Sequence, residues 1–325
     1  MQDFRFVLVG SGNMAAMYAR VLAALPGMSL AATVSRSGRA VADVPIAPSL
    51  EAVDTPFDGV IVATPNGLHA PYAVAAARLG KHVLTEKVLE VTHAAMDAMI
   101  AACRAADVKL AVAFQRRTSP DNRTLKALLE RHALGRVFGA DLTVKYYRDQ
   151  AYYDSAPYRG SRALDGGGPF MQQAAHSLDI YGWFFGLPER VASACGTFCH
   201  SIESEDHGAA LLRHADGMIG TVVASTACKP GFPVRLEIHA ERGTVILEND
   251  AITHWLVDGL ANPAASGDMI IHDGATSAKV ADTAGHEAIL RDFVQAVREN
   301  RAPLVPGEEA RRTTDLVLRI YASPI

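Results

Sequence analysis

The start of the chain constrains its fold more than any other feature. Residues 5–15 read RFVLVGSGNMA, an apolar run that breaks into Gly-x-Gly-x-x-Ala and is followed by a helical pattern. Gly10 permits a tight turn, Gly12 lets the backbone approach a pyrophosphate, and the small Ala15 lets the helix pack on the strand. A glycine motif between a strand and a helix is typical of a dinucleotide-binding βαβ unit. The alternative is a turn in another α/β fold, in which the glycines are only structural.

Length and composition bound the class of protein. The 325 residues are 49% hydrophobic and 20% charged, which is enough for two cores of ordinary domain size. A formal net charge of -4 and the lack of a Lys/Arg block argue against a nucleic-acid partner. The sequence contains no uninterrupted apolar run of about 18 residues, and no basic segment with a cleavage site opens it. We therefore expect a cytoplasmic protein without a membrane partner.

The cysteines predict neither a disulfide framework nor a metal site. Four cysteines are too few to staple a chain of this size, so we expect them to be reduced. Cys195, Cys199 and His200 lie close together in the sequence, but no second pair of ligands follows at the spacing of a zinc site. We expect no metal.

Apolar runs alternate with helical periods over residues 1–118. This alternation predicts an α/β fold that begins with a doubly wound parallel sheet of the Rossmann type, joined by right-handed crossovers. The expected strands are 4–10, 29–35, 58–63, 81–85 and 108–114, and the expected helices are 13–25, 69–79 and 91–106.

From residue 119 onward the pattern changes to grouped strands. Such grouping predicts a C-terminal α+β domain, 119–325, built on an open, mostly antiparallel sheet with helices on one face. Its C-terminal helices can pack back on the first domain. The expected elements are helix 121–133, strand 137–148, a glycine-rich loop, helix 169–185, several strands between 190 and 256, a polar stretch of loop and strand edge over 259–284, and helices 285–299 and 307–322.

The end of the second expected strand bears on the choice of nucleotide. An NAD site has an acidic residue there, which takes the ribose 2′-hydroxyl. This strand ends instead in Ser35 and Arg36, without a carboxylate. A hydroxyl and a guanidinium suit a 2′-phosphate. We therefore favour NADP(H); the alternative is that Arg36 and Arg39 are solvated loop charges and that the site also takes NAD(H).

Two polar groups of residues follow the next strands, at the edge where doubly wound sheets bind ligands. The first group is Thr64, Pro65, Asn66 and His69. The second group is Glu86 and Lys87. A partly desolvated lysine beside a cofactor can donate a proton or polarise a carbonyl. The alternative is a surface lysine paired with Glu86 or Glu90.

A glycine-rich loop in the second domain leads into a segment with a histidine. The run Gly166-Gly167-Gly168 predicts close backbone packing or unusual dihedral angles. Gln172 and His176 are four residues apart and would share one face of the expected helix. A histidine there can accept or give a proton near neutral pH. The alternative is a core histidine with satisfied hydrogen bonds.

Aromatic and basic residues precede these glycines. Tyrosines and arginines between 146 and 160 can stack on and clamp a sugar ring or an acidic group, Tyr153 and Arg159 among them. The alternative is a strand face followed by an ordered loop. The first interpretation places them at the border of a substrate cleft.

Together these motifs resemble the Gfo/Idh/MocA family, oxidoreductases related to glucose-fructose oxidoreductase and inositol dehydrogenase. The resemblance implies a Rossmann domain before a substrate domain whose open sheet commonly forms the subunit interface, here of a homodimer or homotetramer. It also implies reversible hydride transfer between a nicotinamide and a hydroxyl-bearing carbon of a sugar, polyol or related molecule. It rests on the first glycine motif, Thr64-Pro65-Asn66 through His69, Gly80-Lys81-His82-Val83 with Glu86-Lys87, Phe114-Gln115-Arg116-Arg117, Gly166-Gly167-Gly168 with His176 and Asp179, Pro303-Leu304 and Arg311-Arg312.

By this resemblance Lys87 hydrogen-bonds the reacting hydroxyl, and His176 is the general acid or base. Val88 stands where the family motif has proline, which frees a dihedral angle and restores an N–H beside Lys87. Gln172 stands where these dehydrogenases often carry Asp. An amide orients a hydroxyl but does not raise the basicity of His176. Some family members carry an amide there, so we expect activity to remain.

The expected ligand contacts come from both domains. The substrate contacts are expected to be Gln172, Tyr153, Arg159 and Arg117. The nicotinamide is expected to lie between Lys87 and His176. The residues expected to bind the nucleotide are Gly10, Gly12, Asn13, Met14, Ser35, Arg36, Thr64, Pro65, Asn66, His69, Glu86 and Lys87.

Two alternatives to a freely exchanging dehydrogenase stay open at this point. One is an enzyme with a tightly held nucleotide that is reduced and reoxidised within one cycle. The other is a redox-sensing or regulatory protein that binds the nucleotide but has lost the chemistry, and Val88 and Gln172 are the residues that keep this alternative open. The substrate and the direction of the reaction do not follow from the sequence.

Overall fold

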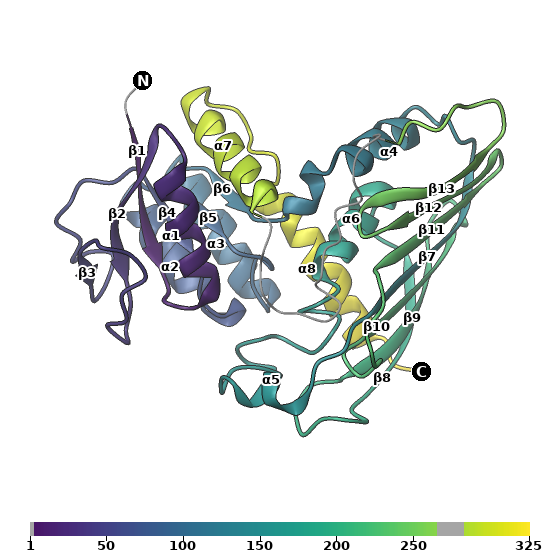
Figure 1. The fold of residues 1–325 in the computed structure, drawn as a ribbon, viewed down its shortest axis with the longest axis horizontal. Helices are drawn as coiled ribbons and strands as arrows, with labels where there is room; N and C mark the ends of the chain where they lie inside the picture. The colour runs from purple at the N-terminus through teal and green to yellow at the C-terminus, as the bar shows by residue number, and fades with distance from the viewer. Residues whose placement is uncertain (1–2, 265–282) are drawn as a thin grey trace. The chain divides into compact units, whose positions relative to one another are not determined.

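The chain folds into two compact units. The structure is a computed structural model that describes residues 3–264 and 283–325 (Figure 1). One unit spans Met1–Phe114 and Lys279–Arg311, and the other spans Gln115–Ala278 and Arg312–Ile325. We call them the first and the second unit. Most of the polar stretch expected over 259–284 lies outside the described residues.

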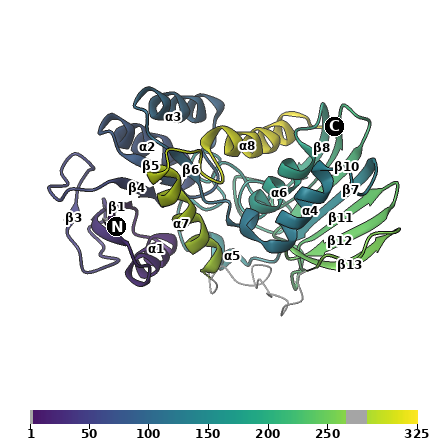
Figure 2. The same cartoon turned by 90° about the horizontal axis from the view of Figure 1, so that it is seen from above.

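The first unit is built on a six-stranded sheet with the order β3-β2-β1-β4-β5-β6. All its strand pairs are parallel, as the alternating pattern predicted. Figure 2 shows α2 and α3 on one face of this sheet and α1 and α7 on the other. The elements are β1 (Phe4–Val9), α1 (Asn13–Ala24), β2 (Met28–Val34), β3 (Ile46–Ala47), β4 (Gly59–Val62), a 3-10 helix η1 (Asn66–Leu68), α2 (His69–Arg78), β5 (His82–Thr85), α3 (His93–Ala105), β6 (Leu110–Val112) and α7 (Ala284–Arg298).

The strands of this sheet are apolar on both sides because helices cover both faces. All four residues of β4 are buried. Helix α7 returns from the end of the chain to this core, where the Phe293 ring lies 6.3 Å from Phe4 and 6.1 Å from Phe6. Aromatic burial of this kind contributes several kcal/mol and explains why α7 belongs to the first unit. Short β3, with only two residues, escaped sequence prediction.

The second unit is built on a seven-stranded sheet with the order β13-β12-β11-β7-β10-β9-β8. Only β7 and β10 pair in parallel; the other neighbours are antiparallel. Buried and half-buried residues alternate along β11, so one face packs on helices and the other does not. The elements are a 3-10 helix η2 (Gln115–Thr118), α4 (Pro120–Glu130), β7 (Val137–Lys145), α5 (Gln150–Asp154), α6 (Ala175–Phe185), β8 (Arg190–Gly196), β9 (His207–Arg213), β10 (Ile219–Ser225), β11 (Arg235–Ala240), β12 (Gly243–Glu248) and β13 (Ala251–Val257). Helix α8 (Gly307–Ala322) begins in the first unit and continues in the second from Arg312.

The expected helix over 169–185 is wrong in its first turn and a half. Helix α6 begins only at Ala175, and residues 169–174 form turns. The N–H of Ala174 donates to Pro169 O at 2.8 Å, a wider turn than an α-helix has. Over residues 3–264 and 283–325, no helix has the length and apolar character needed to cross a bilayer.

Candidate active site

The two glycines of the first motif do different things. Gly10 has φ +123°, and a Cβ there would lie 2.5 Å from Ala63 O at the end of β4. Gly12 is the N-cap of α1 with φ −85°, and a Cβ there would meet no described atom within 4 Å. Gly12 also offers no side chain to cap the first N–H groups of the helix, which include those of Asn13 and Met14. The arrangement leaves open space in front of unsatisfied N–H groups, as a pyrophosphate requires.

Three hydroxyls gather at the carboxyl ends of β1 and β2. Ser37 Oγ lies 3.0 Å from Ser35 Oγ and 3.1 Å from Ser11 Oγ, and it accepts from the N–H of Arg39. Arg36 is exposed beside them. Ser35 itself is buried at the end of β2. Hydroxyl donors and a cation at this point are the chemistry that a 2′-phosphate binds.

His69 joins the loop after β4 to the loop after β5. It is fully buried, with Nδ1 2.9 Å from Val88 O and Nε2 3.1 Å from Thr64 O. Burial lowers the pKa of His69. Pro65 precedes η1, and Asn66 begins it and is buried. Both ring nitrogens of His69 therefore lie against backbone carbonyl groups of the first unit. His69 holds the loops that follow β4 and β5 together.

Glu86 is a buried anchor directly before Lys87. Its carboxylate accepts from the Tyr18 hydroxyl at 2.7 Å and from the N–H of Lys87 at 3.3 Å. His286 Nε2, on α7, lies 3.8 Å from the same carboxylate. Burial and the neighbouring carboxylate raise the pKa of Tyr18 well above its ordinary value, so the phenol stays a donor.

The alternative of a surface ion pair at Lys87 is not supported. Both Glu86 and Glu90 are buried, at 6% and 3% exposure. Glu90 accepts from the N–H groups of Val91 and Thr92, and burial raises its pKa. Lys87 itself is half-buried, and its peptide bond to the buried Val88 is cis. Lys87 therefore comes directly after a buried carboxylate, that of Glu86, and neither Glu86 nor Glu90 is a surface residue.

The glycine-rich loop of the second unit packs against the end of α8. Gly167 has φ +151°, and a Cβ there would overlap the Tyr321 hydroxyl. A Cβ on Gly168 would overlap the carbonyl oxygen of Glu205. The Glu205 carboxylate accepts from the N–H of Gly168 at 3.1 Å and from Tyr321 at 2.8 Å, and burial raises its pKa. The three-glycine prediction of close backbone packing is confirmed.

Gln172 and His176 do not share a helical face, because α6 begins between them. Gln172 lies in the preceding turn, where its amide donates to Asp165 O at 2.6 Å. His176 is the second residue of α6 and is half-buried. The expectation of an i, i+4 pair on one helix is wrong, because residues 169–174 form turns and α6 begins at Ala175. Gln172 instead holds the loop through Asp165.

Arg117 forms a buried ion pair. Its guanidinium binds both carboxylate oxygens of Asp179 at 2.8 Å, and the Thr313 hydroxyl donates to the same carboxylate. Arg117 and Asp179 are 3% and 0% exposed, and the guanidinium lies over the Trp183 ring. A buried bidentate pair is structural. We therefore leave Arg117 out of the substrate contacts.

Of the neighbouring Tyr152 and Tyr153, only Tyr153 was expected to contact the substrate, but the structure buries it. Asp149 caps α5, and the helix turns Tyr153 inward, where its hydroxyl lies 2.7 Å from Thr226 Oγ1. Burial raises the pKa of Tyr153 to about 12. The Arg159 guanidinium stacks on Tyr152, with its carbon 4.1 Å from the centre of the ring. Sequence reasoning did not select Tyr152, and nothing in the Tyr152-Tyr153 pair alone tells which ring faces inward.

The cysteine and histidine cluster of the second unit is structural. The His200 ring lies 2.9 Å from Asp206 and 2.8 Å from Arg148 O. Asp206 also accepts the N–H groups of Phe198 and Cys199. In the part of the chain that the structure describes, no group of three His, Cys, Asp or Glu side chains could hold a metal ion. The four cysteines are free.

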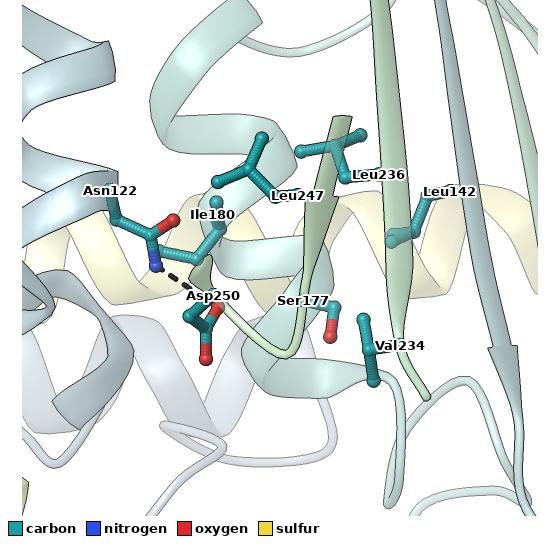
Figure 3. A pocket seen from close by; sticks show the side chains of 8 residues that line it. All are labelled: Asn122, Leu142, Ser177, Ile180, Val234, Leu236, Leu247 and Asp250. Carbon is teal, nitrogen blue, oxygen red and sulfur yellow. Dashed lines mark hydrogen bonds between the residues drawn. The ribbon is translucent and has the colours of Figure 1, made fainter. Parts of the chain in front are cut away.

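A small pocket in the second unit contains none of the expected site residues (Figure 3). It lies between the sheet and α4 and α6. At its rim Asn122 donates to Asp250 at 3.0 Å, and Arg116 lies 3.3 Å from the same carboxylate. Its lining is Asn122, Leu142, Ser177, Ile180, Val234, Leu236, Leu247 and Asp250. Its walls are mostly apolar, and the Arg116–Asp250 ion pair lies at its rim. We interpret it as a packing gap in the core.

The fold and the first glycine motif define a dinucleotide-binding oxidoreductase. Two sequence models match successive parts of the chain: the oxidoreductase family with NAD-binding Rossmann fold over residues 4–114, and the GFO/IDH/MocA C-terminal domain over residues 122–246. The chain belongs to the GFO/IDH/MocA family of oxidoreductases.

Similar proteins are dehydrogenases. Levoglucosan dehydrogenase of Pseudarthrobacter phenanthrenivorans is 27% identical over 289 residues, 76% of this chain and 74% of the relative. Myo-inositol 2-dehydrogenase of Thermotoga maritima is 24% identical over 263 residues, 79% of this chain and 75% of the relative. The structure of the WlbA dehydrogenase from Bordetella pertussis with NADH and UDP-GlcNAcA matches with a TM-score of 0.86 and 27% identity, covering 99% of this chain and 96% of that one. The family match makes this chain an oxidoreductase with an NAD-binding Rossmann domain, and a purely regulatory role is not favoured.

Proposed function

We propose that the protein transfers a hydride between NADP(H) and a secondary hydroxyl or carbonyl of a sugar, polyol or related small molecule, with Lys87 and His176 handling the proton. The observation that carries the proposal is the place of Lys87 after β5, where its backbone N–H donates to the buried Glu86 carboxylate. In the sheet, β1, β4 and β5 are parallel neighbours. The segments after these three strands therefore emerge at one edge of the first unit, where such sheets bind nucleotides.

The first unit has residues that fit a dinucleotide. Open space at Gly12 and the uncapped start of α1 suit the pyrophosphate. When bound, the nicotinamide accepts or supplies the hydride. The residues that we propose to hold or support the nucleotide are Gly10, Gly12, Asn13, Met14, Ser35, Arg36, Thr64, Pro65, Asn66, His69, Glu86 and Lys87.

We propose a preference for NADP(H). The linked hydroxyls of Ser11, Ser35 and Ser37 and the exposed Arg36 support it, because they offer donors and a positive charge but no carboxylate. NADH is named in the matched WlbA structure, so use of both nucleotides is compatible with the family.

The proton steps fall to side chains of this chain. An ammonium at Lys87 donates a hydrogen bond to the reacting oxygen and stabilises its negative charge as the hydride leaves. His176 takes the proton in oxidation and returns it in reduction. Gln172, fixed on Asp165 O, carries no charge and orients a substrate hydroxyl with its carbonyl oxygen.

The protein is also proposed to act as a homodimer or homotetramer in the cytoplasm. Strand register places the apolar side chains of Leu211, Ile219 and Leu256 on the same face of the second sheet, and they are 52%, 54% and 69% exposed. Such a face suits a second copy of the chain. The free cysteines fit a reducing compartment. Light scattering of the purified protein measures the assembly.

Replacement of Lys87 tests the proposed reaction. Lys87→Ala should lower kcat by about 10²–10⁴-fold, the range for loss of a general acid or base, with a much smaller loss of nucleotide affinity, because Lys87 is only one of the proposed nucleotide contacts. Lys109→Ala, at an exposed lysine that donates to Asn300, is the matched control and should keep full activity. Near-normal turnover by Lys87→Ala would remove this lysine from the mechanism.

A further inference from the structure

Two arginines of the second unit are arranged around one tyrosine ring. The Arg159 guanidinium carbon lies 4.1 Å from the centre of the Tyr152 ring, and that of Arg148 lies 5.5 Å from it. Arg148 also donates to Tyr147 O at 2.7 Å. A guanidinium stacked on a ring keeps the N–H donors in its plane available for hydrogen bonds.

The half-buried Arg159 differs from two other arginines of this unit. Arg117 is paired with Asp179, and Arg116 with Asp250. For Arg159, no described carboxylate lies within the 4.0 Å of an ion pair, and its Nε is buried without a hydrogen-bond partner among the described residues. Arg159 is half-buried, so its guanidinium, which has no carboxylate and an unpartnered Nε among the described residues, can still be reached by an anion.

The acidic groups near this pair are occupied elsewhere. Asp165 influences the pKa of Tyr152, but its carboxylate accepts the N–H of Gly160 at 2.8 Å. Asp206 lies against His200. Asp149 accepts the N–H of Tyr152 as the cap of α5. Two guanidiniums therefore lie against one tyrosine ring, and none of these three carboxylates is within ion-pair distance of Arg159.

Hydrogen bonds connect the arginine pair to the proposed catalytic segment. Gln172 binds Asp165 O, and Asp165 holds the N–H of Gly160, the residue after Arg159. Gln173 Nε2 lies 3.5 Å from the Tyr152 hydroxyl. The loop that carries Arg159 and the Tyr152 ring are thus each hydrogen-bonded to residues 172–173, shortly before His176 in the chain.

We propose that Arg159, stacked on Tyr152 and supported by Arg148, is an anion subsite that binds a carboxylate or phosphate carried by the sugar-like substrate. This rests on the proposed function, since it names the class of substrate for the same site. The preferred substrates are then acidic sugars or sugar phosphates rather than neutral polyols. A planar guanidinium binds either oxyanion with two parallel hydrogen bonds.

Binding of three probes by calorimetry to the protein saturated with NADPH tests the subsite. The probes are D-glucuronate, D-glucose 6-phosphate and D-glucose, which share a pyranose ring and differ in charge. We expect at least one anionic sugar to bind about tenfold or more tightly than D-glucose, from one or two charge-assisted hydrogen bonds. The stronger of the two anions identifies the carboxylate or the phosphate as the group recognised. Equal affinities for all three sugars, or no binding of any of them, would overturn the proposal.

Variants separate the subsite from general packing. Arg159→Gln should weaken binding of the anionic sugar by about 10–100-fold and leave D-glucose unchanged. Arg159→Lys, which keeps the charge but loses the planar fork, should recover part of the affinity. Arg162→Gln, an exposed arginine of the same loop, is the matched control and should bind as the unaltered protein does. Unchanged affinity in Arg159→Gln would exclude this arginine.

The two proposals fail in different ways. Anion-selective binding without oxidation of any acidic sugar, aldose or polyol by NADP⁺ or NAD⁺ would keep the subsite and remove the proposed reaction. Oxidation of neutral polyols, with no advantage for acidic sugars and no effect of Arg159→Gln, would keep the reaction and remove the subsite.

Discussion

The glycine turn of the first unit and the Arg117–Asp179 pair of the second unit are held by different means. Backbone geometry shapes the turn, where Gly10 packs against Ala63 and Gly12 leaves space before a helix. The Arg117–Asp179 pair is formed by side-chain atoms alone. Backbone geometry follows from local sequence, whereas a side-chain network depends on residues far apart in the chain. The first kind of site can be predicted from sequence, and the second needs the fold.

The largest expected effect breaks the network of the second unit. Asp179→Ala should destabilise the protein by about 3–5 kcal/mol, because it leaves the buried Arg117 guanidinium without its carboxylate. Urea unfolding measures the free energy. Glu130→Ala, at an exposed i, i+4 pair with Lys126, is the control and should cost less than about 1 kcal/mol. Similar costs for both variants would contradict a structural role for the buried pair.

The next prediction distinguishes a glycine needed for folding from a glycine needed for nucleotide binding in the first unit. Gly10→Ala should cost about 2–4 kcal/mol of stability, because the new Cβ meets Ala63 O at a positive φ. Gly12→Ala should fold normally, since its Cβ meets no described atom, yet it should lose nucleotide affinity. Thermal unfolding and NADPH titration distinguish the two. A Gly12→Ala protein that binds NADPH as before would show that the open space is not the pyrophosphate site.

A smaller effect concerns pH in the second unit. Burial lowers the pKa of His214, whose Nε2 lies 3.0 Å from the Tyr181 hydroxyl. The unfolded chain therefore binds a proton below about pH 6.5 that the folded chain does not, and stability falls as pH falls through that value, by at most about 1.4 kcal/mol per pH unit.

Comparison with variants isolates this histidine. Between pH 7.5 and 5.5, His214→Gln should lose less stability than the unaltered protein. The exposed His254→Gln should follow the unaltered protein. Parallel pH profiles for His214→Gln and the unaltered protein would show that His214 does not contribute.

The smallest effect lies in α6. Gly182 is inside the helix, and a Cβ there would meet no described atom within 4 Å, so Gly182→Ala should stabilise by roughly 0.5–1 kcal/mol. Gly186 ends the same helix at φ +76°, and Gly186→Ala should destabilise by about 1 kcal/mol. Melting temperatures check both signs. Destabilisation by Gly182→Ala would contradict the open space found at this position.

Most of the fold was predictable because its signals are local. The alternation of strands and helices gave the parallel sheet, and grouped strands gave the mostly antiparallel one. The start of α6 was not predictable, because the preceding loop is held by contacts distant in sequence, such as that of Gly168 with Glu205, 37 residues away. Short β3 and α5 have too few residues for a periodic signal.

The candidate site was predictable in part. Ser35 and the two glycines lie at strand ends that sequence locates, and Lys87 follows a strand in the same way. The internal partners of Glu86 were not predictable, since Tyr18 and His286 are 68 and 200 residues from it along the chain. The roles of Tyr152 and Tyr153 depend on which side of α5 faces the core, and that follows only from the packed structure.

Fluorescence titration of the purified protein with NADPH and with NADH tests the central claim most directly. The absorbance spectrum is recorded first, to detect any nucleotide retained through purification. We predict saturable binding of both nucleotides, tighter for NADPH, through the donors at Ser35 and Arg36. No saturable binding of either, by protein shown to be free of nucleotide, would contradict the assignment of the first unit as a nicotinamide-dinucleotide site.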